Sequence, residues 1–190
     1  SYDKAIDLID QSSRGHWYLY YVRGTAHDRL GDWEAAMRDF DRALDLAPNQ
    51  FQVLNYVGYS LVDRGEKLDE ALEMIQKAVV AQPDAGYIID SLGWAQYRLG
   101  YYNEAVVHME RAAELMATDP IVNDHLGDVY WAVGRKTEAQ FQWRRALSFA
   151  TYYSGPEEVD PKRIQRKLEV GLATVLAEEG AVPLKMADGD

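Results

Sequence analysis

The fold of this 190-residue chain is decided by the stretch Gly93-Trp94-Ala95-Gln96-Tyr97-Arg98-Leu99-Gly100-Tyr101-Tyr102-Asn103-Glu104-Ala105. Its two glycines stand seven residues apart, and an alanine follows the second glycine after five residues. A glycine inside a helix costs about 1 kcal/mol, so Gly93 makes sense where two helices approach closely. Gly100 suits the left-handed end of a helix. The stretch therefore predicts two helices that turn at Gly100 and pack together through Gly93 and Ala105.

This spacing recurs along the chain. The other glycine pairs are Gly24 and Gly31, Gly58 and Gly65, and Gly127 and Gly134, and the first glycines of the four pairs are separated by 34, 35 and 34 residues. The accompanying alanines are Ala36, Ala71 and Ala139, and seven residues after each of them and after Ala105 stands another alanine: Ala43, Ala78, Ala146 and Ala112. A regular period of this length predicts stacked helical hairpins in which each unit packs on its neighbours.

These units resemble tetratricopeptide repeats, and bacterial ones in particular, as in Asp90-Ser91-Leu92-Gly93-Trp94. The resemblance implies an all-α, right-handed superhelical solenoid with four repeats at 17–50, 51–85, 86–119 and 120–153. The bulky residue expected late in each second helix appears as Phe40, Ile75, Met109 and Trp143. Three departures stand out: Arg23 replaces an apolar residue, Asn123 replaces a large one, and repeats three and four lack the closing proline.

The two ends of the sequence carry partial signals. Residues 2–11 read as the second helix of a truncated repeat, which predicts that the sequence begins inside a longer solenoid. Asp160-Pro161 is a good helix start, and an apolar stripe predicts one capping helix over 161–179. Residues 181–190 are expected to form a flexible tail.

Composition excludes several classes of protein. The longest fully apolar run, 17–22, is far too short for a membrane helix. A net charge of -11 argues against general nucleic-acid binding. The absence of cysteine excludes thiolate metal sites and cysteine nucleophiles. The chain is expected to be soluble, in a bacterial cytoplasm or periplasm, because a cysteine-free chain tolerates both compartments.

The resemblance also implies a concave groove lined by the second, fifth, ninth and twelfth residues of each repeat. From these positions we predict a partner-binding site made of Tyr21, Asn55, Tyr59, Tyr87, Asp90, Trp94, Tyr97, Asp124, Asp128 and Trp131. Such a surface suits a peptide or helix that is neutral to basic and partly apolar. The alternative for any single aromatic residue is that it packs between neighbouring helices.

The residues do not assemble into a catalytic constellation. His125 lies between Asp124 and Asp128, which could indicate a metal site or an acid–base pair, but a hydrated polar patch on the groove wall is the favoured interpretation. We therefore predict a non-enzymatic protein-binding scaffold without cofactor or metal. The lysines and arginines with which chaperone-binding relatives hold a terminal carboxylate are missing from the groove positions.

Several alternatives remain open at this point. The segment could be the substrate-recognition arm of a larger enzyme, such as a glycosyltransferase, or a self-association module. Segment 135–167 holds eight basic and four acidic residues, so it could dock an acidic partner or an anionic membrane, or form a solvated cap. The oligomeric state cannot be read from the sequence.

Overall fold

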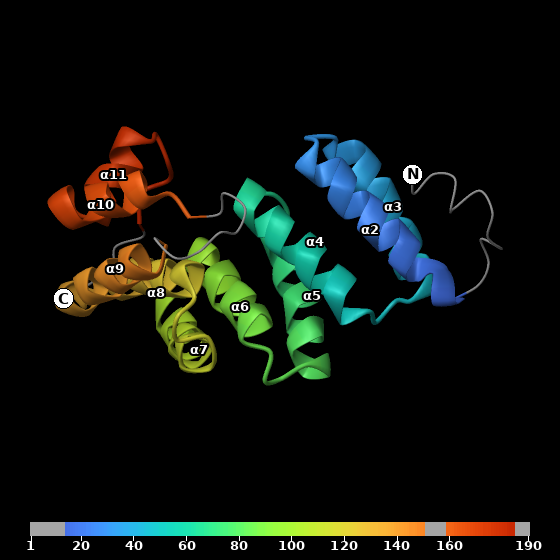
Figure 1. Cartoon of the computed structure of the whole chain (residues 1–190), viewed down its shortest axis with the longest axis horizontal. Helices are drawn as coiled ribbons and strands as arrows, with labels where there is room; N and C mark the ends of the chain where they lie inside the picture. Colours follow the sequence, from blue (N-terminus) through green and yellow to red (C-terminus); the bar gives the residue numbers. More distant parts are fainter. Residues whose placement is uncertain (1–13, 151–158, 185–190) are drawn as a thin grey trace. The chain divides into compact units, whose positions relative to one another are not determined.

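The computed structural model of the chain describes residues 14–150 and 159–184, and all regular structure in these ranges is helical (Figure 1). The chain divides into two compact units, Ser1–Gln82 and Pro83–Asp190. In the first unit a short 3-10 helix, η1 (Arg14–His16), precedes α2 (Trp17–Arg29), α3 (Trp33–Leu46), α4 (Phe51–Arg64) and α5 (Leu68–Ala81). The second unit contains α6 (Gly86–Leu99), α7 (Tyr102–Leu115), α8 (Pro120–Ala132), α9 (Lys136–Ala150), α10 (Pro161–Val170) and α11 (Leu172–Glu178).

The helices pair as helical hairpins, α2 with α3, α4 with α5, α6 with α7 and α8 with α9. The turn at Gly100 shows why the sequence dictates this arrangement. Its φ of 87° is the left-handed conformation that ends α6, and its N–H donates to the Tyr97 carbonyl at 2.9 Å. The helix-turn-helix architecture predicted from the repeated glycines is confirmed.

Small residues let the paired helices approach closely. A methyl group added to the mid-helix glycine of each repeat would run into the bulky residue of the second helix: Gly24 into Phe40, Gly58 into Ile75, Gly93 into Met109, and Gly127 into Trp143. Those four bulky side chains are fully buried, as are the facing alanines Ala36, Ala71, Ala105 and Ala139. The small-to-large pairing that the spacing predicts is therefore present in all four repeats.

The two substituted repeat positions have local explanations. Arg23 donates from Nε and Nη2 to the buried Asp39 at 2.8 and 2.6 Å, so an ion pair joins α2 to α3. Asn123 is fully buried, and its amide donates to the carbonyls of Ala117 and Asp119 at 3.2 and 2.6 Å. Asn123 thus closes the turn before α8 where other repeats carry a large side chain.

The C-terminal segment differs from the prediction. A single helix is expected over 161–179, but the structure has two helices, α10 and α11. Gly171 lies between them with φ 84° and ψ 156°, a backbone conformation that interrupts the helix. α10 begins at Pro161, and the Asp160 carboxylate caps it by accepting from the N–H groups of Lys162 and Arg163 at 2.9 and 3.2 Å. We call α10 and α11 together the C-terminal helix pair.

Some predicted segments fall outside the described residues: the truncated-repeat helix at 2–11, the last residues of repeat four at 151–153, and 185–190 of the predicted tail. Residues 181–184 of that tail are described and contain no helix, yet Leu184 packs against the hydrophobic core of the second unit. The C-terminal helix pair contributes Ile164 and Leu172 to this core.

Candidate functional site

Seven of the ten predicted site residues lie on α6 and α8, the first helices of repeats three and four. They are Tyr87, Asp90, Trp94, Tyr97, Asp124, Asp128 and Trp131. The C-terminal helix pair touches several of them, so this face is not open in the way the sequence suggests.

The deepest contact is made by Lys167 of α10. Its side chain is fully buried, and its ammonium group donates to Asp124 Oδ1 at 2.5 Å and to Asp128 Oδ1 at 2.6 Å. Asp128 is buried as well, and its Oδ1 also accepts from the Trp143 indole N–H at 2.9 Å. Arg163, one helical turn before Lys167, places a guanidinium nitrogen 3.7 Å from Asp128 Oδ2.

A second buried pair joins α6 to α8. The His125 Nδ1 lies 3.0 and 3.1 Å from the two carboxylate oxygens of Asp90. The His125 ring stacks on Trp94 with centroids 4.1 Å apart, and Trp94 stacks in turn on Tyr97 at 4.8 Å. A protonated imidazole in this place is stabilised both by the carboxylate and by the indole face.

Together these contacts form one group of alternating charge, which we call the charge cluster. It consists of Asp90, Asp124, Asp128, His125, Arg163 and Lys167. Three carboxylates face three basic side chains, and the charges balance when His125 is protonated. The charge cluster thus joins α6, α8 and α10 by ion pairs inside the chain, whereas the sequence favoured a hydrated patch on the groove wall.

Burial and neighbouring charges together shift the pKa values of Asp124 and His125. Burial raises the pKa of Asp124 and the nearby Asp128 raises it further, although the charge of Lys167 acts in the opposite direction. Burial alone would lower the pKa of His125, but the charge and hydrogen bond of Asp90, helped by Asp124 and Asp128, raise it above its ordinary 6.5. Burial also raises the pKa of the Tyr97 hydroxyl.

Apolar contacts surround the charge cluster. Trp131 lies against Gly171, the residue between α10 and α11. A side chain on Gly171 would come within 2.5 Å of the indole ring. Leu168 and Leu176 pack against the same core as Trp94 and Trp131. The Lys167 ammonium also lies 5.4 Å from the Trp143 ring centroid.

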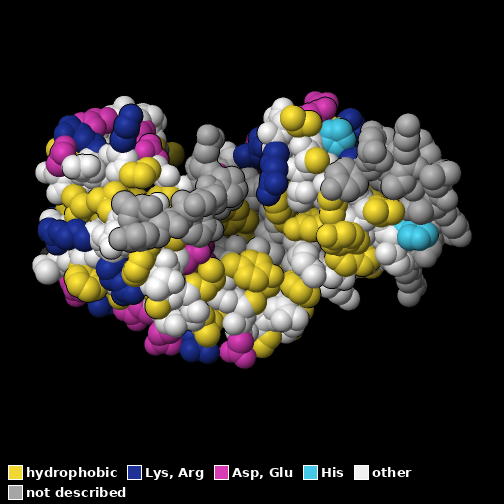
Figure 2. Space-filling model, in the orientation of Figure 1, with side chains coloured by type: hydrophobic (Ala, Val, Ile, Leu, Met, Phe, Trp, Pro, Cys, Tyr) yellow, Lys and Arg dark blue, Asp and Glu magenta, His cyan; other side chains and the backbone are white. Residues whose placement is uncertain are grey.

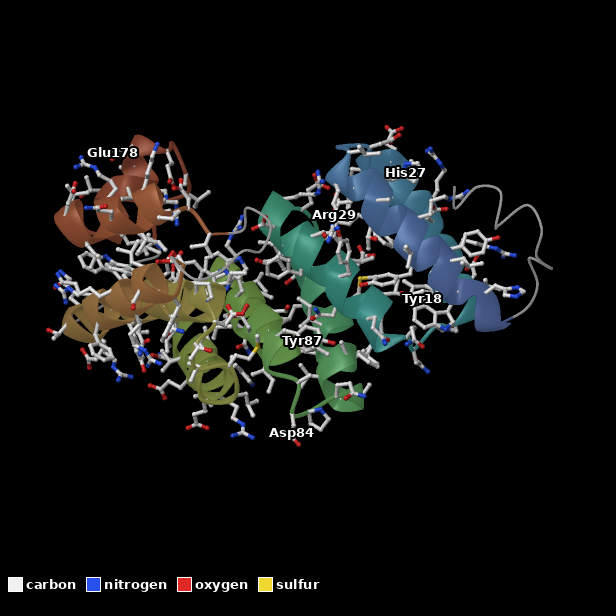
Figure 3. The ribbon with its side chains drawn as sticks, in the orientation of Figure 1. Tyr18, His27, Arg29, Asp84, Tyr87 and Glu178 are labelled. Carbon is white, nitrogen blue, oxygen red and sulfur yellow. The ribbon has the colours of Figure 1, made fainter. Side chains whose placement is uncertain are left out.

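The remaining predicted residues are Tyr87, Tyr21, Asn55 and Tyr59. Tyr87, at the start of α6, is 47% exposed (Figure 3). In the first unit, Tyr21 is half-buried and packs against Phe40, with ring centroids 6.3 Å apart. Asn55 is buried, and its Oδ1 accepts no hydrogen bond from any residue that the structure describes. Tyr59 is half-buried on α4.

Sequence reasoning missed Lys167 and Arg163 as parts of this site. The signal was present, because Lys167 falls three residues after Ile164 and therefore on the buried stripe of its helix. A lysine at a core position needs an anionic partner. Asp124 and Asp128, which the sequence predicted as groove residues, are the anionic partners of Lys167.

The sequence profile of the tetratricopeptide repeat family matches residues 7–151. The chain belongs to the tetratricopeptide repeat family. The TPR repeat-containing protein PA4667 of Pseudomonas aeruginosa is 35% identical over 110 residues, which cover 58% of this chain but only 18% of that relative. The chain thus corresponds to a small part of the length of this relative.

Solved structures agree on the fold. PilW, described as a widely conserved type IV pilus biogenesis factor, superposes with a TM-score of 0.74 at 18% identity, covering 93% of this chain and 79% of PilW. TTC0263, a thermophilic TPR protein of Thermus thermophilus, gives 0.66 at 20% identity, with 86% and 83% covered. MamA of Desulfovibrio magneticus RS-1 gives 0.62 at 22% identity, with 73% and 78% covered.

A fold of this family supports a protein–protein interaction module. Within 14–150 and 159–184 no group of three or more His, Asp or Glu side chains is arranged to hold a metal ion. No helix in the same ranges is both long and apolar enough to cross a membrane.

Proposed function

We propose that this chain binds a peptide or helix of a partner protein through the first helices of its repeats. The family supports an interaction module in general, and the side chains on the first helices support binding through these helices in particular. The partner is expected to be partly apolar, because aromatic residues dominate the predicted positions on both units.

The observation that carries the proposal is the exposure of large aromatic side chains on first helices. Tyr18 on α2 is 56% exposed and Tyr87 on α6 is 47% exposed (Figure 3). The core positions of the repeats are already filled by other residues, so packing inside the repeat does not account for these tyrosines. Tyrosine offers a large rigid contact area and a hydroxyl group, which suits a protein-binding surface.

Site-specific photo-crosslinking tests binding through the first helices directly. A photoreactive phenylalanine analogue replaces Tyr18 or Tyr87 in the native cell, and Val107 serves as the control because it is 65% exposed on α7, a second helix. The proposal predicts that the same partner is captured from Tyr18 and Tyr87 but not from Val107. Equal capture from Val107, or capture from Val107 alone, would move the binding site to the second helices.

A further inference from the structure

We propose that a partner helix can displace the C-terminal helix pair and bind to repeats three and four in its place. This partner helix carries a basic residue in the position of Lys167. This inference deepens the proposed function and rests on it. The surface that the pair covers, which we call the docking surface, is formed by Asp124, Asp128, Trp131 and Trp143.

Charge complementarity defines the first requirement on the partner. Asp124 and Asp128 meet at a single ammonium group, and no other described side chain lies as close to both carboxylates as Lys167 does. When the helix pair leaves, two neighbouring carboxylates remain beside aromatic rings, an arrangement that favours a cation. A partner without a basic residue at this point would leave both carboxylates desolvated and unpaired.

The apolar contacts define the second requirement. Ile164 and Leu168 lie four residues apart on α10, and both pack into the core of the second unit, as does Leu172 at the start of α11. Lys167 projects from the same side of α10. An amphipathic helix with one cation inside its apolar stripe reproduces this pattern, and laying such a helix on an apolar groove is a common mode of peptide recognition.

The helix pair also has the internal contacts of a separate element. Arg166 pairs with Glu178 of α11 at 2.6 Å, and Arg163 pairs with Glu179, the residue that follows α11, at 2.7 Å, so two ion pairs join α10 to the end of α11. Figure 2 shows Lys, Arg, Asp and Glu side chains gathered on the outside of the pair. The C-terminal helix pair therefore has a polar outer face and ion pairs of its own that do not depend on the repeats.

The experiment uses a fluorescently labelled peptide of residues 159–184 as the probe and measures its anisotropy with the full chain. The Lys167→Met chain has a weakened helix pair but an unchanged docking surface. We expect it to bind the peptide at least about tenfold more tightly than the parent chain does. Lys162→Met is the matched control, because Lys162 lies on the same helix but is exposed, and this chain should bind like the parent.

Charge recognition is tested with the peptide. A probe in which the residue equivalent to Lys167 is methionine should bind the Lys167→Met chain at least about tenfold more weakly than the natural probe. Adding Asp124→Asn and Asp128→Asn to the chain should remove this preference. Persistence of the preference in that triple variant would contradict the role of the two carboxylates.

The proposal is overturned if the folded Lys167→Met chain binds the probe no better than the parent does. The helix pair would then be a permanent cap, while crosslinking from Tyr18 and Tyr87 would still decide the proposed function separately. If Lys167→Met does not fold by circular dichroism, Arg163→Ala replaces it, because that side chain is 30% exposed. If sedimentation shows that the parent chain is a dimer and that the probe peptide dissociates it, the docking surface binds a second copy of the chain. This result would contradict the partner proposed here.

Discussion

At the scale of single residues, His125 links α8 to α6 through its contacts with Asp90 and Trp94. Its ring lies between the Asp90 carboxylate and the Trp94 indole, within 3.0 Å of the former and 4.1 Å from the centroid of the latter. Because Asp90 outweighs the effect of burial, the pKa of His125 stands above 6.5 in the folded chain. In the unfolded chain the same imidazole has its ordinary pKa.

The sign of the resulting pH dependence follows from this raised pKa. The folded chain binds the proton more tightly, so His125 contributes stability that is complete below about pH 6 and is lost as the pH rises through its folded pKa. We predict that the free energy of unfolding decreases as the pH rises above about 6.5, by at most about 1.4 kcal/mol per pH unit. Urea titrations of the parent and of His125→Gln measure this difference.

The variant should be less stable than the parent at the lower pH, and the gap should narrow as the pH rises. His108→Gln is the control, because His108 hydrogen-bonds to the Gln96 amide oxygen at 2.8 Å and not to a carboxylate. A pH-independent gap between His125→Gln and the parent would show that the imidazole contributes by packing alone.

Gly127 tests the close approach of paired helices. Alanine is favoured over glycine inside a helix by about 1 kcal/mol, yet a methyl group here would overlap the fully buried Trp143 ring. Overpacking of this kind costs about 1–3 kcal/mol. We predict that Gly127→Ala destabilises the chain in urea unfolding, and a stabilised variant would contradict the helix packing described.

The bulky partners of the glycines were predictable from the sequence, since the repeat fixes which residues face one another. The partners of the acidic residues were not. Lys167 follows Asp128 by 39 residues and Asp124 by 43, so neither separation equals the repeat period. The resemblance to tetratricopeptide repeats predicts that Asp124 and Asp128 line a groove, but only the folded chain shows that Lys167, from an element outside the repeats, pairs with them.

At the scale of elements, the C-terminal helix pair depends on the break at Gly171. The apolar stripe from Ile164 to Leu176 continues across this residue, which is why the sequence predicts one helix. In the structure the backbone turns at Gly171 in a conformation that almost only glycine adopts, and Trp131 fills the space where a side chain would stand. The stripe alone carries no signal for this turn.

Gly171→Ala should therefore loosen the helix pair specifically. The strain of the backbone costs about 1–3 kcal/mol, and the added methyl group also meets Trp131. We predict faster amide hydrogen exchange in α10 and α11, with exchange in α2 to α5 unchanged. Gly180→Ala is a suitable control, because Gly180 also has a positive φ, 66°, but nothing lies within 4 Å of the added methyl group. Equal acceleration in the two variants would contradict the contact with Trp131.

At the scale of the whole molecule, the sequence predicts the architecture better than the binding surface. Every hairpin recurs at the repeat period, so local glycines and alanines determine the fold. The charge cluster depends on single contacts between repeat four and the C-terminal helix pair, and these contacts do not recur from repeat to repeat. Within the second unit, the three groove acids that the sequence assigns to a basic partner are paired inside the chain.

The central claim is that the charge of Lys167 fastens the helix pair to the acidic residues of α8. A double-mutant cycle with Lys167→Met and Asp128→Asn, followed by urea unfolding, tests it most directly. Asparagine keeps an oxygen that can accept from Trp143. We predict that Lys167→Met alone costs about 3–5 kcal/mol, and that the two changes couple by at least about 1 kcal/mol. Effects that add to within about 0.5 kcal/mol would contradict the claim.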